Sequence, residues 1–332
     1  MAQQVDVLIV GAGLAGLLAA RTLGDRGVRS LVLDKGRNPG GRIATRSMDG
    51  GLADHGAQFF TVRDPLFRTM VDGWLENGLA FEWSRGWSDG SLAATRDGQP
   101  RYAINGGMNA LAKHLARGLD VRLNVKLMAA RPVDGGWEVE DANGSRQRAR
   151  SLLLTPPVPQ SLALLKEGGF WLSQELYDAL TSIEYEPCLT GLFHVEGNVA
   201  LPHPGAIQRP HAPIYWIADN QRKGISPDVK ILTLEASPSY SRQLYDRTDE
   251  DILKSFRVDL QPFLAQSGHV VSAQLKRWRY SQPITNYPER CLVVEGQAPL
   301  VFAGDAFGEA RVEGAVLSGI AAGDALVSLL GQ

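Results

Sequence analysis

Cysteine is scarce in this 332-residue chain: only Cys188 and Cys291 occur, far apart and in no CxxC arrangement. Neither a disulfide framework nor a dithiol redox centre is therefore indicated. Disulfides are rare in reducing compartments, so this composition favours a cytoplasmic protein. The first ten residues also lack a basic leader and a cleavage site, which argues against export.

An excess of charge is missing as well, since 34 basic and 36 acidic side chains leave a formal net charge of -2. Without a broad basic field, nucleic acid is not expected as a partner. No apolar stretch reaches the roughly 20 residues that a membrane-spanning helix needs. The nearest candidate, residues 315–330, contains Gly319, Gly323 and Asp324, and no membrane association is expected.

Metal and nucleophile signatures are absent too. The six histidines never take the HxxH or HExxH spacing that would place two ligands on one helical face, so no metal site is expected. No G-x-S-x-G elbow or other hydrolase signature occurs. The chain is nevertheless long enough for two cores, and its composition is that of an ordinary globular enzyme.

What the chain does contain begins with a strand, turn and helix pattern. Residues 5–10 form a short apolar run that is followed at once by the sequence GAGLAG. Gly11 permits a tight turn, Gly13 lets the backbone approach a pyrophosphate, and Gly16 lets the helix pack closely on the strand. The first N–H groups of that helix would face the phosphates.

An acidic residue follows at the expected distance from these glycines. Residues 30–34 read as a second strand with Asp34 at its tip. Asp34 should accept hydrogen bonds from the adenosine ribose of a dinucleotide. The pattern predicts an α/β fold with a Rossmann-like dinucleotide-binding domain.

Features beyond Asp34 favour FAD over NAD as the dinucleotide. A second glycine loop, Gly40-Gly41-Arg42, follows the acid, and Arg42 and Arg46 could neutralise phosphate charge. Residues 121–155 read as short strands broken by two glycine turns, which indicates a β-meander in place of a crossover helix.

A third feature lies near the end of the sequence. A strand at residues 300–303 is followed by Gly304-Asp305, and Glu313 to Ala315 open an amphipathic helix. No second GxGxxG occurs, so any nicotinamide would bind as a substrate. Neither cysteine lies at the start of this helix, so the FAD is expected to be non-covalent.

The middle of the sequence predicts a smaller α+β substrate domain built on an antiparallel sheet. Longer runs of alternating apolar residues lie between about residues 166 and 290, with a helix predicted over residues 249–266. The expected domains are a discontinuous FAD-binding domain of residues 1–58, 101–165 and 291–332, and a substrate domain of residues 59–100 and 166–290.

Five segments, PGGRIATR, DHGAQFFTVRDPLF, INGGMNAL, KRWRYSQP and RVEGAVLSG, resemble those of the bacterial renalase-like proteins over essentially the whole length. These proteins belong to the amine-oxidase-like branch of the FAD superfamily. The resemblance implies that Asp305 binds the ribityl or pyrophosphate part and that the helix from Val312 points its positive end toward the flavin ring. It also places Gly56, Ala57 and Gln58 beside that ring and Val125 at the adenine through its backbone.

The motifs and the resemblance together give one set of predicted cofactor residues: Gly11, Gly13, Leu14, Ala15, Gly16, Asp34, Lys35, Gly40, Gly41, Arg42, Gly56, Ala57, Gln58, Val125, Thr155, Gly304, Asp305, Val312, Glu313, Gly314 and Ala315.

Aromatic side chains are the candidates for the walls of a pocket over the flavin ring. They are Phe59, Phe60, Trp216, Trp278 and Tyr280, although for each of them taken singly core packing is the better interpretation. Trp278 and Tyr280 stand out because alternate residues of a strand share a face. Trp278, Tyr280, Gln58 and Phe59 are the predicted pocket and flavin-face residues, and Arg277 and Arg279 would face solvent.

The resemblance implies a specific activity: oxidation of aberrant 2- and 6-dihydro isomers of NAD(P) to NAD(P)+, with O2 reduced to hydrogen peroxide. The residues alone leave two alternatives open. One is an amine oxidase or a desaturase-like flavin oxidoreductase, and the other is a flavin-binding protein without turnover. A small-molecule substrate is expected both for the isomer oxidase and for the amine oxidase or desaturase-like enzyme. No obligate protein partner is evident.

Overall fold

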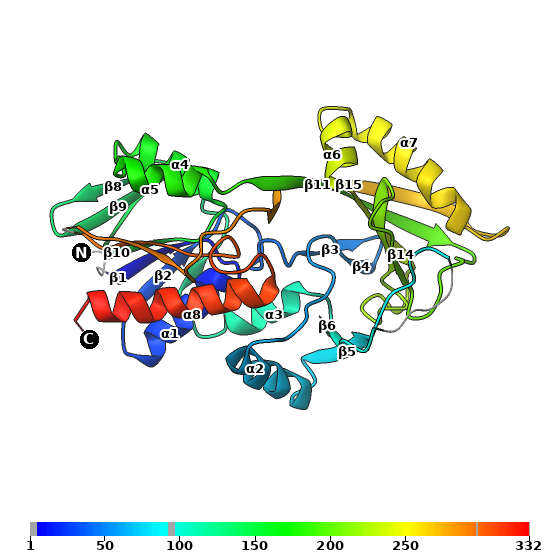
Figure 1. Ribbon diagram of the computed structural model, residues 1–332, viewed down its shortest axis with the longest axis horizontal. Coiled ribbons are helices and arrows are strands. Elements are labelled where there is room, and N and C mark those ends of the chain that lie inside the picture. Colours follow the sequence, from blue (N-terminus) through cyan, green and yellow to red (C-terminus); the bar gives the residue numbers. More distant parts are fainter. Residues whose placement is uncertain (1–4, 92–96, 297, 332) are drawn as a thin grey trace. The chain divides into compact units, whose positions relative to one another are not determined.

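The computed structural model of the chain describes residues 5–91, 97–296 and 298–331. The chain divides into two compact units, each assembled from separate stretches of sequence (Figure 1). Unit 1 comprises residues 1–41, 111–185 and 283–332, and unit 2 comprises residues 42–110 and 186–282.

Unit 1 is built on a mainly parallel sheet with helices. Its elements are β1 (Val5–Val10), α1 (Leu14–Asp25), β2 (Ser30–Leu33), α3 (Asn109–Leu115, which begins in unit 2), β7 (Val121–Arg122), β8 (Leu127–Val133), β9 (Gly136–Asp141), β10 (Arg146–Leu154), α4 (Val158–Glu167), α5 (Gln174–Thr181), β16 (Leu292–Val294), β17 (Leu300–Phe302) and α8 (Val312–Leu329).

The sheet of unit 1 has the spatial order β16-β17-β10-β1-β2-β7. Neighbours from β17 to β7 pair in parallel, whereas β16 pairs antiparallel with β17. β8, β9 and β10 form an antiparallel meander, with Gly135 and Gly144 at positive φ in its two turns. The predicted Rossmann-like domain with a β-meander is confirmed.

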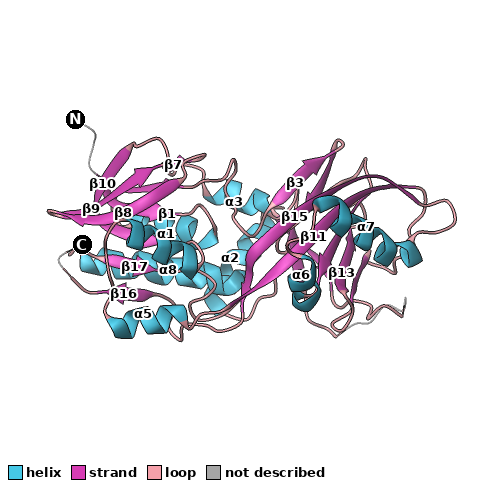
Figure 2. Ribbon diagram, turned by 90° about the horizontal axis from the view of Figure 1, so that it is seen from above, coloured by secondary structure: helices cyan, strands magenta, loops and turns pink. Residues whose placement is uncertain are grey.

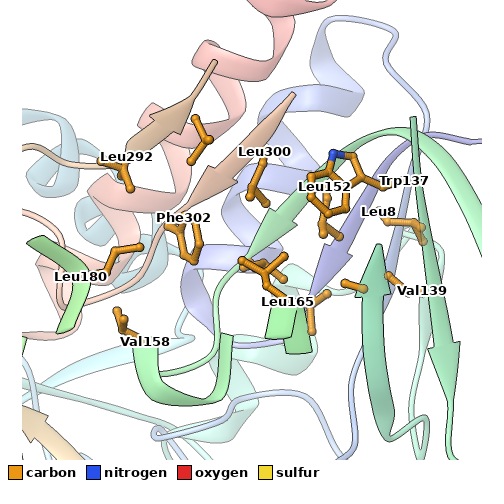
Figure 3. Close-up of a cluster of buried hydrophobic side chains, with 14 of the residues drawn as sticks. Leu8, Trp137, Val139, Leu152, Val158, Leu165, Leu180, Leu292, Leu300 and Phe302 are labelled. Carbon is orange, nitrogen blue, oxygen red and sulfur yellow. The ribbon is translucent and has the colours of Figure 1, made fainter. Parts of the chain in front are cut away.

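The core of unit 1 explains why its strands read as continuous apolar runs. Leu8, Leu152 and Leu300 from three neighbouring strands cluster with Leu165 of α4 and Leu180 of α5 (Figure 3). Parallel strands with both faces covered must be apolar on both faces.

Helices α1 and α8 lie side by side in unit 1 (Figure 1). A Cβ on Gly319 would lie 2.3 Å from the carbonyl oxygen of Ala15, and one on Gly323 would lie 2.7 Å from Cβ of Thr22. Contrary to the sequence-based expectation, α8 is long and apolar enough to cross a membrane by length and composition, with a mean hydropathy of 1.4. More than half of it (56%) is buried against the rest of the protein, as in the core helix of a globular domain.

Unit 2 contains one large antiparallel sheet and two separate two-stranded hairpins. Its elements are β3 (Thr45–Met48), β4 (Gly51–Asp54), α2 (Pro65–Glu76), β5 (Ala80–Ser84), β6 (Arg101–Ile104), β11 (Tyr185–Glu196), β12 (Ala206–Gln208), β13 (Ile214–Asp219), β14 (Ile231–Ala236), α6 (Pro238–Leu244), α7 (Asp249–Leu260), a 3-10 turn (Gln261–Phe263) and β15 (His269–Pro283).

The large sheet of unit 2 has the order β12-β13-β14-β11-β15, and helix α7 packs on it (Figure 2). Ile252, Phe256 and Leu260 of α7, spaced four residues apart, cluster with Phe193 of β11 and Leu232 of β14. The predicted α+β architecture on an antiparallel sheet is confirmed.

The predicted helix over residues 249–266 is too long. Thr248 caps the first turn of α7 by accepting a hydrogen bond from the N–H of Asp251 at 3.2 Å. The α-helix ends at Leu260 and continues only as the 3-10 turn. Pro262 lacks the N–H that a continuing helix would need.

The two units divide the chain differently from the expected domains. Residues 42–58 and 101–110 belong to unit 2, although the sequence assigns them to the cofactor domain. Residues 166–185 and 283–290 belong to unit 1 rather than to the substrate domain. The physical reason is core formation, since Met48 and Ala53 of the β3/β4 hairpin cluster with Leu192 of the large sheet in unit 2.

Candidate cofactor and active site

Four of the predicted cofactor residues meet at one edge of the parallel sheet in unit 1. Gly11, Asp34 and Thr155 directly follow β1, β2 and β10, and Gly304 comes two residues after β17. The last residue of β1, Val10, is in register with the last residues of β2 and β10. Because β2 and β10 flank β1 on opposite sides, this carboxyl edge contains the switch point where open α/β sheets bind ligands.

The first glycine loop has the local geometry that the sequence predicts. Gly11 has a φ of 102°, and a Cβ there would lie 2.5 Å from Oγ1 of Thr155. A Cβ on Gly16 would lie 2.0 Å from the carbonyl oxygen of Gly11, so α1 can approach the loop only with glycine. Nothing lies within 4 Å of a Cβ on Gly13, which leaves room for a ligand to approach the backbone.

The N-terminus of helix α1 is suited to bind an anion. Its N-cap residue, Gly13, provides no side-chain cap, so its first N–H groups have no capping side chain. Leu14 and Ala15, the first residues of the helix, are buried. N–H groups at a helix N-terminus are suited to bind phosphate.

Asp34 ties the glycine loop to the end of β2. Its Oδ2 accepts a hydrogen bond from the N–H of Ala12 at 2.7 Å, and its Oδ1 accepts one from Gly36 at 2.6 Å. The N–H of Val125 donates to the carbonyl oxygen of Asp34 at 2.9 Å. Each carboxylate oxygen can accept a further hydrogen bond, so the ribose role predicted for Asp34 is compatible with this geometry.

The second glycine loop touches the first. The N–H of Gly40 donates to the carbonyl oxygen of Ala12 at 2.8 Å, and a Cβ on Gly41 would lie 3.6 Å from Cα of Gly13. The neighbouring Lys35 donates from Nζ to Oε1 of Gln160 at 3.2 Å. The two loops thus present backbone at one place in unit 1.

The C-terminal motif joins the same edge. Gly304 has a φ of 141°, and its N–H donates to Oγ of Ser318 in α8 at 2.8 Å. The carbonyl oxygen of Asp305 accepts a hydrogen bond from Nδ2 of Asn286 at 2.9 Å. The first bond fixes the turn after β17 against α8, and the second fixes it against the segment that precedes β16.

Helix α8 begins at Val312, as the sequence predicts. Its N-cap residue, Arg311, makes no side-chain capping bond. Glu313 is buried, and a Cβ on Gly314 would lie 1.8 Å from the carbonyl oxygen of Glu309, so the chain can fold back tightly only with glycine there. The N–H of Ala315 donates to the carbonyl oxygen of Arg311 at 3.0 Å.

Four further predicted cofactor residues, Arg42, Gly56, Ala57 and Gln58, belong to unit 2. The N–H of Ala57 donates to the carbonyl oxygen of Arg42 at 2.8 Å, and a Cβ on Gly56 would lie 2.0 Å from that oxygen. The guanidinium of Arg42 lies 3.4 Å from the carbonyl oxygen of Ser281 in β15. The backbone around residue 56 therefore passes close to the backbone of Arg42.

The aromatic candidates separate into core residues and partly exposed ones. Trp216 and Phe60 are buried, and the Phe60 ring packs against Tyr102 with centroids 5.7 Å apart. Phe59 is half-buried, with its ring 5.6 Å from that of Trp216 and 5.2 Å from that of Trp87. The core interpretation therefore holds for Phe60 and Trp216.

Trp278 forms a stacked pair with His55. Its Nε1 donates to the carbonyl oxygen of His55 at 2.6 Å, and the two rings stack with centroids 5.5 Å apart. Nζ of Lys276 lies 4.8 Å from the centre of the Trp278 ring. Burial, Arg46 and Lys276 lower the pKa of His55 to about 3, so the imidazole is neutral at physiological pH. Tyr280 is half-buried two residues further along β15.

Arg277 is partly exposed, with 28% of its side chain accessible, and it is also held by hydrogen bonds. Its guanidinium donates to the carbonyl oxygens of Tyr245 and Arg247 and pairs with Asp249. These bonds join β15 to the segment that leads into α7. Arg279 is exposed, as expected, with its guanidinium 5.9 Å from the centre of the Tyr245 ring.

Comparison with known proteins identifies the family. A protein-family model described as flavin containing amine oxidoreductase matches residues 79–327, which is most of the chain. The chain belongs to the flavin-containing amine oxidoreductase family. A second model, the NAD(P)-binding Rossmann-like domain, matches residues 9–74 and covers the glycine loops described above. The protein is therefore a flavin-dependent oxidoreductase.

Individual relatives agree with this assignment. Renalase from Mus musculus is 26% identical over 333 residues, which cover 95% of this chain and 96% of the relative. Putrescine oxidase from Kocuria rosea is 39% identical over 67 residues, but these cover only 20% of this chain and 14% of the relative. The first similarity is global, whereas the second is local.

Solved structures show the same fold. A putrescine oxidase bound to putrescine superposes with a TM-score of 0.72 at 16% identity, covering 99% of this chain and 100% of the other. A putative protoporphyrinogen oxidase from Exiguobacterium sp. 255-15 gives a TM-score of 0.71 at 15% identity, covering 99% and 100%. At these identities the likeness concerns the fold alone.

This amine oxidoreductase also holds a buried polar cluster in unit 2 that the sequence analysis missed. Nζ of Lys223 lies 2.6 Å from Oδ2 of Asp54, and both side chains are fully buried. Nε2 of Gln58 lies 3.2 Å from Oε1 of Glu235, and the hydroxyl of Tyr215 donates to Oε2 of Glu235 at 2.7 Å. The available signal was a charged residue, Glu235, inside the apolar run of β14, where all six residues are buried.

Substituting Gly16 by alanine is expected to abolish flavin retention. The added Cβ would lie 2.0 Å from the carbonyl oxygen of Gly11 and must displace the loop that approaches the phosphates. The ratio of flavin to protein absorbance after purification measures this. Gly24→Ala in the same helix is the matched control, because its Cβ meets nothing within 4 Å and alanine favours the helix. A fully yellow Gly16→Ala protein would contradict the assigned role.

Proposed function

We propose that this protein is an FAD-dependent oxidase that converts the 2- and 6-dihydro isomers of NAD(P) to NAD(P)+ while O2 is reduced to hydrogen peroxide. The observation that carries the proposal is the match to renalase along nearly the whole of both chains. The segments that resemble the renalase-like proteins lie in both units, which supports a shared function as well as a shared fold.

The FAD would be held without a covalent bond. The glycine loops of unit 1, Asp34 and the turn at Gly304 and Asp305 offer backbone N–H groups and hydrogen-bonding side chains for its dinucleotide part. Both cysteines are free, and neither lies in α8. When bound, FAD supplies the acceptor for the hydride and the donor for O2.

The protein residues then have to position the substrate and exclude side reactions. A dihydronicotinamide gives up its hydride without a base, because the product is an aromatic pyridinium. This suits a chain without a nucleophile signature, because the protein can accelerate the reaction by positioning the substrate. Trp278, Tyr280, Phe59 and Gln58 are the residues proposed to line the substrate pocket.

The test is anaerobic mixing of the purified holoenzyme with an equilibrated isomer mixture of dihydro-NAD, followed by flavin absorbance in a stopped-flow instrument. Rapid bleaching by the minor isomers is expected, and pure 4-dihydro-NAD, the control, should leave the flavin oxidised. Readmitting oxygen should restore the absorbance and release hydrogen peroxide. Fast reduction by an amine, with none by the isomers, would overturn the proposal.

Amine oxidation is the second candidate function. The family name and the local similarity to putrescine oxidase favour it, and the aromatic side chains of unit 2 could enclose a neutral amine. Putrescine in the same stopped-flow experiment distinguishes the two, because it would bleach the flavin only under this alternative.

We also propose a cytoplasmic location. Support comes from the two free cysteines, of which Cys188 is buried and burial raises its pKa. An inert buried thiol is common in reducing compartments.

A further inference from the structure

Gln58 carries a buried amide oxygen with no hydrogen-bond partner in the part of the chain that the structure describes. The side chain is 5% exposed. Its Nε2 lies 3.0 Å from the carbonyl oxygens of Asp54 and Gly56 and 3.2 Å from Oε1 of Glu235. Three acceptors around Nε2 fix the orientation of the amide. A buried acceptor without a donor is costly, so Oε1 is the atom that a bound molecule should satisfy.

The residues behind Gln58 hold it in place. Nζ of Lys223 donates to the carbonyl oxygen of Gln58 at 2.5 Å and pairs with Asp54. The backbone of Gln58 is therefore anchored by a buried ion pair, and its side chain is anchored by the acceptors around Nε2. An acceptor held in this way binds a donor without a further loss of conformational freedom.

Glu235 is the carboxyl group that controls the charge of this cluster. Asp54 and Lys223 neutralise each other, whereas Glu235 forms no ion pair within 4 Å among the described residues. Burial raises the pKa of Glu235 to about 7, against hydrogen bonds from Tyr215 and Gln58 that lower it.

The groups that face Glu235 come from every element packed against it: Tyr215 of β13, Cys188 of β11, Asp54 of β4, Lys223 after β13 and Gln58 after β4. In its ionised form Glu235 polarises the Gln58 amide, which makes Oε1 a stronger acceptor.

We propose that Oε1 of Gln58 accepts a hydrogen bond from the primary carboxamide N–H of a nicotinamide ligand, and that Glu235 is the positioning residue that sets the acceptor strength of this amide. The inference rests on the proposed function, because it takes a nicotinamide as the ligand. It assigns a specificity: a carboxylate in place of the carboxamide has no N–H to donate and adds a negative charge beside Glu235.

The test compares NAD+ with nicotinic acid adenine dinucleotide, its carboxylate analogue, as ligands of the oxidised holoenzyme. Dissociation constants come from the change in flavin absorbance on titration. The wild type is expected to prefer NAD+ by about tenfold, the value of one hydrogen bond, and Gln58→Leu to lose this preference. Gln243→Leu, at an exposed position of α6, is the matched control and should keep it.

The pH dependence of NAD+ binding shows whether Glu235 is a positioning residue or has a merely structural role. In the wild type the affinity for NAD+ should fall as the pH drops through about 7, where Glu235 takes up a proton. Glu235→Gln should bind NAD+ with an affinity that does not change over this range. Tyr215→Phe removes a hydrogen bond that lowers the pKa of Glu235, so its transition should move to higher pH. Glu196→Gln, at an exposed glutamate of β11, should behave as the wild type.

Each failure has its own signature. If dihydro isomers reduce the flavin but Gln58→Leu keeps the tenfold preference, the inference is wrong and the proposed function stands. A pH dependence that persists in Glu235→Gln would likewise overturn the inference, and it decides the matter if Gln58→Leu does not fold. If the wild type binds no NAD+ and is not reduced by the isomers, the proposed function fails and the inference fails with it.

Discussion

Replacing Lys223 by methionine is expected to lower the free energy of unfolding of unit 2 by about 3–5 kcal/mol at neutral pH. The ammonium group lies 2.6 Å from Oδ2 of Asp54, with both side chains fully buried. Methionine fills a similar volume but leaves the carboxylate without its partner, and an unpaired buried charge is among the most costly defects in a protein. Urea denaturation followed by tryptophan fluorescence measures the loss.

The neutral double variant shows whether the ion pair is the cause. Asp54→Asn combined with Lys223→Met removes both charges and should recover a large part of the lost stability, because the desolvation cost of both ions also disappears. Lys254→Met, at an exposed position of α7, is the matched control and should change the free energy of unfolding by less than about 0.5 kcal/mol. A Lys223→Met protein as stable as the control would show that the pair contributes nothing.

The dinucleotide half of this protein could be predicted from sequence because its signals are local. Gly11, Gly13 and Gly16 act on one turn and one helix, and Asp34 follows at the tip of the next strand. Each of these residues constrains backbone within a few positions of itself, so spacing along the chain carries the information. The helix from Val312 was predictable for the same reason.

The polar cluster of unit 2 could not be predicted in this way. Asp54 and Lys223 are 169 positions apart, and the sheet of unit 2 brings them together. No periodic pattern distinguishes a buried glutamate with partners from an isolated charge in an apolar strand. The resemblance to the renalase-like proteins singled out Gln58 but gave no sign of Glu235 or Tyr215.

The domain boundaries expected from the sequence differ from those of the two units for a related reason. The sequence shows where strands and helices lie, but the core that each of them joins depends on contacts made far away in the chain. The β3/β4 hairpin follows the second glycine loop directly, yet the hydroxyl of Thr233 in β14 donates to the carbonyl oxygen of Asp54 at 2.8 Å. The hydrogen bonds of Arg277 could not be predicted either, since its partners lie about 30 positions earlier.

Replacing Glu235 by glutamine is expected to stabilise the protein at alkaline pH and to leave it nearly unchanged in acid. Burial raises the pKa of Glu235 from its usual 4.5 to about 7. Between these values the folded protein holds a proton that the unfolded chain has released, so the wild-type free energy of unfolding declines as the pH rises from about 4.5 to about 7. Glutamine has no such proton and keeps the hydrogen-bonding shape of the side chain.

Above about pH 7 the wild type carries the full cost of an ionised buried carboxylate, which the shift in pKa sets at up to about 3 kcal/mol. Denaturant unfolding of both proteins at about pH 5 and about pH 8 measures the difference. Glu196→Gln, whose side chain is 62% exposed, should show no comparable pH-dependent gain. A stability difference between wild type and Glu235→Gln that stays constant with pH would mean that Glu235 does not titrate in this range. The same residue would then be unable to adjust the Gln58 amide near neutral pH, so this measurement tests the protonation of the cluster without any ligand.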